Sequence, residues 1–137
     1  MWAWSRRVPD LFDEFHEQVD AGAIATCHPV ILELLYSARG HDEFLRLRGE
    51  LGVLVTCPIG PAQWDRAVAV YDLLAAQGPR HQRQVGHADL LIAAAAEAAG
   101  VPVLHYDEDF DRIAGVSGIA TRWVRPRGSL GEAPGRG

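Results

Sequence analysis

The residues with the clearest chemical potential are three carboxylic acids that each adjoin an apolar segment. Asp107 directly follows the apolar run 101–106 and opens the segment D-E-D-F-D. Asp89 lies near the start of the alanine-rich stretch 88–99, and Glu33 interrupts the apolar run 30–36. Ligand sets made only of oxygen suit Mg²⁺ or Mn²⁺ rather than Zn²⁺. If the three acids converge, phosphodiester hydrolysis is the natural chemistry for the ions they would hold.

Each acid also has a purely structural explanation. Asp107 or Asp109 could cap the short helix that follows, and for this segment both explanations stay open. Asp89 taken alone is better explained by a favourable interaction with a helix N-terminus. However, an acid at the mouth of a buried helix is costly unless it has a partner, and a metal is one such partner. Glu33 would need no partner on an exposed polar stripe, but its apolar neighbours on both sides make us favour a site.

The elements that must position these acids alternate between helices and strands. This pattern predicts an α/β fold in which a parallel sheet has helices on both faces. Ligands bind such sheets at the carboxyl ends of the strands, which is where Asp107 falls. Only about three strands are predicted and none at the N-terminus, which is few for six helical segments. Helical spacing and Gly or Pro boundaries predict helices over about 9–21, 29–38, 42–51, 61–77, 88–99 and 107–114, strands over 53–57, 101–106 and 119–124, a short connection at 23–27 and a polar loop at 79–86.

The length of 137 residues suits one domain, predicted over 1–125, with a flexible tail over 126–137 that is rich in Gly, Pro and Arg. No apolar run is long enough to span a bilayer, and the N-terminus has no signal-peptide pattern. Cys27 and Cys57 form no C-x-x-C pair, so we expect buried thiols in a reducing cytoplasm. The sequence therefore predicts a cytoplasmic protein without a membrane anchor.

All 13 basic residues are arginine. The absence of lysine excludes a G-x-x-x-x-G-K-[ST] phosphate loop and a Schiff-base lysine. A net charge of −5 argues against a bulk electrostatic grip on nucleic acid, but it does not exclude a nuclease whose clustered acids are neutralised locally by metal. Arginine suits phosphate contact because its planar fork is bidentate. Arg112 could equally pair with Asp109. The candidates for RNA contact are Arg6, Arg7, Arg80, Arg83 and Arg112.

Three segments, 31–39 (ILELLYSAR), 88–96 (ADLLIAAAA) and 103–113 (VLHYDEDFDRI), resemble the three later motifs of the PIN-domain family in order, spacing and flanking residues. They resemble in particular its VapC-type toxins from toxin–antitoxin pairs, over about residues 2–125. The resemblance implies an α/β/α sandwich with a parallel sheet, a Mg²⁺- or Mn²⁺-dependent endoribonuclease, inhibition by a small cognate antitoxin and, commonly, a homodimer. It also implies that Glu33, Asp89 and Asp107 are catalytic acids and metal ligands, with Asp109 as a supplementary ligand.

The front of the chain departs from the family pattern. The family begins with an apolar strand that ends in an Asp, whereas Met1 and Trp2 stand where the end of that motif is expected. Three explanations of the missing strand and Asp are ranked in this order: the recorded start is too late, the gene is a degraded copy, or Asp10 or Asp13 takes the place of the missing acid. Because the family's first strand is central in the sheet, we expect the chain as written to be a poor nuclease that an upstream strand would rescue. The alternative function is a catalytically impaired PIN-like module that mainly binds an antitoxin.

Two other hydrolase classes fit less well. His87 and His105 each stand two residues before an Asp, as a His-containing metallohydrolase would need. Residues two apart share a face only on a strand, so His87 is poorly placed, and a structural histidine is the better explanation for both. A nucleophilic hydrolase is weaker again, because no Ser lies in a G-x-S-x-G motif.

Overall fold

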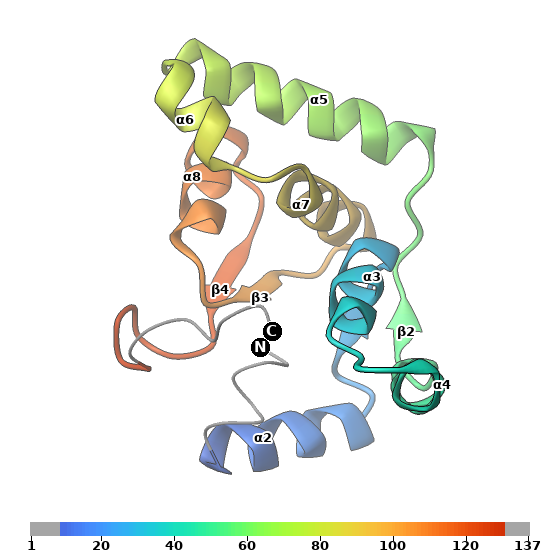
Figure 1. Cartoon of the computed structure of the whole chain (residues 1–137). Helices are drawn as coiled ribbons and strands as arrows, with labels where there is room; N and C mark the ends of the chain where they lie inside the picture. The colour runs from blue at the N-terminus through green and yellow to red at the C-terminus, as the bar shows by residue number, and fades with distance from the viewer. Residues whose placement is uncertain (1–8, 131–137) are drawn as a thin grey trace. The chain divides into compact units, whose positions relative to one another are not determined.

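The computed structural model describes residues 9–130, which fall into two compact units (Figure 1). One unit ends at Cys57, and the other runs from Pro58 to Leu130. Each unit is described by itself. Within the described residues, no helix has both the length and the apolar character needed to cross a bilayer.

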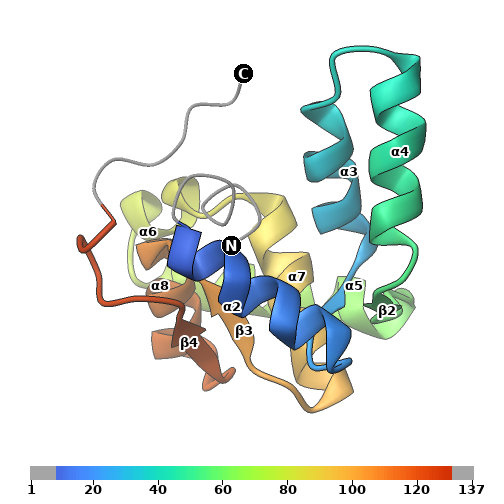
Figure 2. The same ribbon diagram turned by 90° about the horizontal axis from the view of Figure 1, so that it is seen from below.

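Over residues 9–57, the first unit contains three helices and one pair of parallel strands. Its elements are α2 (Pro9–Asp20), β1 (Ala25–Thr26), α3 (His28–Tyr36), α4 (His41–Leu51) and β2 (Val55–Thr56). Strand β1 pairs with β2 in parallel, with Thr26 opposite Thr56. Helices α3 and α4 pack side by side around Leu35, Leu47 and Leu51 (Figure 2).

The second unit contains four helices and another pair of parallel strands. Its elements are α5 (Pro61–Ala76), α6 (Pro79–Gln84), α7 (His87–Ala99), β3 (Val103–His105), α8 (Glu108–Ser117) and β4 (Thr121–Trp123). Strand β3 pairs with β4 in parallel, and His105 lies opposite Trp123. The connection between the two strands is α8, so this is a β-α-β unit of the kind that parallel pairing requires.

The core of the second unit forms where α5, α7 and α8 meet. Val70 and Leu74 of α5 and Ile113 of α8 are almost fully buried there. Helix α7 contributes Ala93 and Ala96, whose small side chains allow α5 to lie close against it (Figure 1). The guanidinium of Arg66 on α5 joins these helices at the rim, because it donates to both carboxylate oxygens of Glu97 on α7 and to the carbonyl of Ser117 on α8.

Local sequence signals explain where the site-bearing helices begin and end. Helix α7 begins after Gly86 and ends at Gly100, whose φ of 71° is a left-handed conformation that glycine adopts without strain. Helix α8 ends in the same way at Gly118, with φ 74°. Asp107 caps the start of α8 by accepting a hydrogen bond from the backbone amide of Asp109 at 2.9 Å.

Most predicted elements are confirmed, and two segments were assigned wrongly. Residues 79–84 form the short helix α6 rather than a polar loop, and Pro79 stands at its first position, where proline fits. The predicted connection 23–27 contains strand β1, so the described residues hold four short strands rather than three. Both thiols are buried and free, as expected. Burial raises the pKa of Cys27, opposed by the backbone amide of Val30 and assisted by Cys57.

Candidate metal site at two helix N-termini

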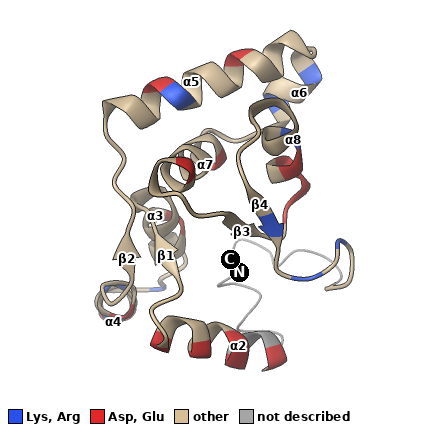
Figure 3. Cartoon of the chain, turned by 180° about the vertical axis from the view of Figure 1, so that it is seen from behind, with Lys and Arg blue, Asp and Glu red and all other residues tan. Residues whose placement is uncertain are grey.

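Three carboxylates of the second unit converge where α7 and α8 begin. Asp89 lies in the first turn of α7, Asp107 caps α8, and Asp109 lies in its first turn. One oxygen from each of the three lies within 4.8 Å of the other two. The partial positive charge of both helix N-termini favours the carboxylates and reduces the cost of bringing them together. The acidic residues at the start of α8 are visible in Figure 3.

Asp107 can cap helix α8 and also bind a metal ion. One of its carboxylate oxygens, Oδ1, accepts from the amide of Asp109 and so caps α8. A carboxylate has lone pairs to spare after one such bond. Its side chain is exposed and therefore accessible to a ligand from solvent. Capping and metal binding are thus compatible at this residue.

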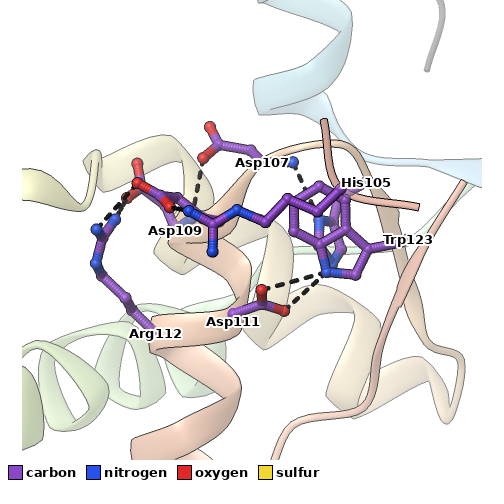
Figure 4. A network of polar contacts seen from close by, with 8 residues as sticks. His105, Asp107, Asp109, Asp111, Arg112 and Trp123 are labelled. Carbon is purple, nitrogen blue, oxygen red and sulfur yellow. Dashed lines mark hydrogen bonds and ion pairs between the residues drawn. The ribbon is translucent and has the colours of Figure 1, made fainter. Parts of the chain in front are cut away.

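Asp109 is the most constrained of the three acids. Its pKa is raised by burial and by the negative charge of Asp107, and the hydrogen bond and positive charge of Arg112 oppose that rise. Arg112 also donates to Glu108 at 3.1 Å, so its guanidinium bridges two acids of α8 (Figure 4). The sequence left open whether Arg112 pairs with Asp109 or serves RNA. The structure shows the pairing, and RNA contact stays a prediction.

The remaining acids of the D-E-D-F-D segment serve packing between elements. Both oxygens of Asp111 accept from the indole nitrogen of Trp123, at 3.0 and 3.2 Å, which ties α8 to β4. Figure 4 shows the Asp111 carboxylate directed toward Trp123. Glu108 accepts from Arg127, which lies after β4. The sequence carried no signal for either contact, because both partners lie more than ten positions away.

His105 ends β3 and is buried, with 3% of its surface exposed. Its Nδ1 accepts from the backbone amide of Asp107 at 3.2 Å, while its Nε2 is buried with no hydrogen-bond partner among the described residues. Burial lowers the pKa of His105, opposed mainly by the nearby Asp111 and Asp107. Within residues 9–130, the potential metal-binding group contains no histidine, so the His-containing metallohydrolase gains no support.

Glu33 does not have the environment that its sequence suggested. Helix α3 is apolar nearly all round, yet only Leu35 is buried, and Glu33 is exposed beside the exposed side chains of Leu32 and Tyr36. Glu33 is therefore exposed, and its apolar neighbours do not enclose it as the sequence suggested. Glu33 belongs to the first unit and the three converging aspartates to the second, and its participation in the site stays a prediction.

The predicted RNA-contacting arginines fall into three groups. Arg6 and Arg7 lie outside the described residues. Arg80 and Arg83 are exposed on α6, the short helix that precedes α7 and Asp89, and not on a loop as predicted. Arg112 holds the acids of α8. Positions 80 and 83 are neighbours on one helix face, so the two guanidinium groups can meet one strand of phosphates together.

The donor chemistry of the converging aspartates fits a hard divalent cation. All three ligand atoms are carboxylate oxygens, which Mg²⁺ and Mn²⁺ prefer. The three oxygens lie within 4.8 Å of one another, so small side-chain rotations would let one cation contact all of them. Burial and, after it, the negative charge of Asp107 raise the pKa of Asp109, and a bound cation would favour the charged form of this carboxylate.

Comparison with known proteins gives a consistent result. The family model of the PIN domain matches residues 3–116. Ribonuclease VapC18 of Mycobacterium tuberculosis is 40% identical over 129 residues, which cover 93% of this chain and 94% of that protein. Ribonuclease VapC51 of the same species is 42% identical and covers 81% of this chain and 79% of its own length. Ribonuclease VapC21, also from that species, is 33% identical, covering 89% and 88%.

Proposed function

The chain belongs to the PIN domain family, and from that premise we propose that it is a divalent-metal-dependent endoribonuclease toxin of a toxin–antitoxin pair. The observation that carries the proposal is the convergence of Asp89, Asp107 and Asp109 on one point at two helix N-termini. The relatives named Ribonuclease VapC supply the substrate class, RNA. The cofactor that fits the oxygen donors is Mg²⁺ or Mn²⁺.

We assign Asp89 and Asp107 as the principal ligands and Asp109 as a supplementary one. A divalent cation bound there would activate water as a nucleophile and stabilise the negative charge that develops on the phosphodiester. Asp107 is well placed to hold its position during a reaction, because the same carboxylate caps α8. Asp109 must share its carboxylate with Arg112, so it is less available.

Two further assignments rest on the sequence. Glu33 is proposed as an additional acid of the site because its motif matches the family's second acidic motif. Arg80 and Arg83 are proposed to contact the phosphates of RNA because they are exposed on the helix that leads toward Asp89. Arg6, Arg7 and Arg112 are weaker candidates for the same role.

Cleavage assays with matched variants test the proposal. Labelled RNA is incubated with the wild type, Asp89→Asn and Asp107→Asn, in Mg²⁺, in Mn²⁺ and in EDTA. Asparagine caps helices as well as aspartate does, so Asp107→Asn removes charge without removing the cap. We expect cleavage to fall by at least about 10–100-fold in either variant, the range found when even the partners of metal ligands are lost. Asp72→Asn, at an exposed position of α5, is the control. Equal cleavage in EDTA would contradict the proposal.

The same assay separates the alternative function. A PIN-like module that only binds an antitoxin would leave RNA intact under every metal condition and would still form a complex with the antitoxin. The antitoxin itself is proposed as a small protein partner, and a homodimer is a further expectation. Light scattering of the protein alone and with the co-expressed partner measures both.

A further inference from the structure

His105 occupies the point where β3 ends and the chain turns toward the acids. Its carbonyl accepts from the amide of Val124 at 2.9 Å, which is the last backbone hydrogen bond of the β3–β4 pair. Two residues later, Asp107 is already outside the strand and caps α8. A backbone amide at such a turn has no ladder partner, and a buried or half-buried amide without an acceptor is costly.

The imidazole of His105 supplies the missing acceptor. Its Nδ1 accepts from the amide of Asp107 at 3.2 Å (Figure 4). The Asp107 carboxylate in turn accepts from the amide of Asp109 at 2.9 Å. The side chain of His105 therefore holds the backbone amide of Asp107, and the side chain of Asp107 holds the backbone amide of Asp109. In this way His105 fixes the backbone from which the Asp107 carboxylate projects.

The rest of the imidazole shows what this histidine adds beyond packing. Its ring lies between Phe110 and Trp123, with centroids 5.1 and 4.9 Å away, a setting that an apolar side chain would fill equally well. Its Nε2 is fully buried and has no hydrogen-bond partner among the described residues. A leucine would carry no such orphaned atom. Among the described residues, the bond accepted by Nδ1 is therefore the one hydrogen bond that the His105 side chain makes.

We infer that His105 is a positioning residue for the candidate metal site: as a neutral imidazole protonated on Nε2, it holds the Asp107 amide through Nδ1 and thereby orients the Asp107 carboxylate toward Asp89 and Asp109. The inference rests on the proposed function for the identity of the ligand. Neutral imidazole has one donor and one acceptor nitrogen, so an acceptor Nδ1 fixes the proton on Nε2. Outer partners of this kind commonly tune metal sites by orienting the ligands.

Two substitutions and a core control separate positioning from packing. His105→Leu introduces an apolar side chain of similar size, which can fill the same space, and removes the Nδ1 acceptor. His105→Asn places a carbonyl oxygen near the position of Nδ1 and restores it. Ile113→Ala removes a fully buried apolar side chain of α8 from the core and leaves the acceptor of the Asp107 amide in place, so it reports on loss of packing. Each protein is characterised by hydrogen exchange of the Asp107 amide without metal, by Mn²⁺ titration calorimetry and by thermal unfolding.

We expect His105→Leu to speed exchange of the Asp107 amide about tenfold, as loss of one ordinary hydrogen bond would, and to weaken Mn²⁺ binding by about 10–100-fold. His105→Asn should recover most of both. Ile113→Ala should unfold at a lower temperature while it keeps its Mn²⁺ affinity. In the wild type, ¹⁵N NMR of the imidazole should show the proton on Nε2.

Four results would overturn the inference while leaving the proposed function intact: wild-type Mn²⁺ affinity in His105→Leu, equal losses in the leucine and asparagine variants, an equal loss in Ile113→Ala, or a proton on Nδ1. A wild type that binds no Mn²⁺ would instead overturn the proposed function. The exchange of the Asp107 amide, measured without metal, would then still decide whether His105 holds that backbone.

Discussion

The Asp109 carboxylate accepts a hydrogen bond from the Arg112 guanidinium and lies near the negatively charged Asp107 carboxylate. Burial and the charge of Asp107 raise its pKa, and Arg112 offsets only part of this effect. The net rise means that the folded protein binds the Asp109 proton more tightly than the unfolded chain does. Protonation of this residue therefore favours folding, and its charged form opposes folding at neutral pH.

The stability of an Asp109→Asn variant should show this effect with a defined pH dependence. Without divalent metal, we expect the variant to unfold at a higher temperature than the wild type at neutral pH, because it carries no charge. The difference should shrink as the pH falls through the raised pKa and vanish below the ordinary value near 3.8. Mn²⁺ should stabilise the wild type more than the variant.

Thermal unfolding across this pH range in EDTA, repeated with Mn²⁺, measures both effects. Asp72→Asn on α5 is the matched control and should leave the pH profile of the wild type unchanged. A variant that is less stable than the wild type at neutral pH would show that Asp109 contributes to the fold mainly through Arg112.

At the scale of elements, helix α7 positions Asp89 by being buried along most of its length. Ala93 and Ala96 belong to the core that α7 shares with α5 and are 1% and 8% exposed, so no side chain larger than alanine fits there without displacement. The alanine-rich pattern therefore serves close packing against α5, and it fixes the direction of the N-terminus that carries Asp89.

Ala93→Leu should destabilise the protein by about 1–3 kcal/mol, the usual cost of overpacking a core. Because α7 would shift, we also expect weaker Mn²⁺ binding through Asp89. Ala98→Leu, at an exposed position of the same helix, is the control and should change neither property. Chemical denaturation and calorimetry measure the two effects. Wild-type stability in Ala93→Leu would mean that the α5–α7 contact is looser than described.

The helices and strands differ in how well the sequence predicts them. The long helices followed from apolar spacing with Pro or Gly at their ends, as at Pro61 and Gly100. Strand β1 was missed because two residues are too few for alternation to register. Helix α6 was missed because it has no buried residue, so its sequence lacks the apolar period that marks a helix.

Site residues divide in a similar way. Asp89 and Asp107 could be identified as candidate ligands from the sequence because each acid adjoins an apolar segment, and their carboxylates converge in the structure, while metal binding stays a prediction. The exposure of α3 could not be predicted, because an apolar helix has the same sequence pattern whether its faces are covered or exposed. Leu32 and Tyr36 are exposed here. The hydrogen bond from the Asp107 amide to His105 depends on a ring orientation that sequence does not encode.

For the whole molecule, charge is distributed unevenly despite a net value of −5. Helix α2 carries five acidic residues and no arginine, whereas basic side chains appear on α6 and β4 (Figure 3). An acidic protein can still grip RNA where arginines gather, and the strength of that grip depends on salt.

An Arg80→Ala, Arg83→Ala double variant should weaken RNA binding and flatten its salt dependence. If each arginine neutralises one phosphate of single-stranded RNA, the slope of log K against log salt should decrease by about 1.4. Binding is measured in EDTA, so that cleavage does not interfere. The control is Arg46→Ala with Arg48→Ala, two exposed arginines of α4. If the α4 pair changes the slope and the α6 pair does not, the RNA path has been assigned to the wrong helix.

The proposed activity depends on a divalent cation held by the acids at the start of α7 and α8. Its most direct test is an anomalous difference map from crystals of the wild-type protein grown with Mn²⁺. We predict a peak within about 2.0–2.6 Å of carboxylate oxygens from Asp89 and Asp107, with Asp109 beside it. A map in which Mn²⁺ is absent from these side chains, or is bound only elsewhere on the protein, would contradict the proposed metal site.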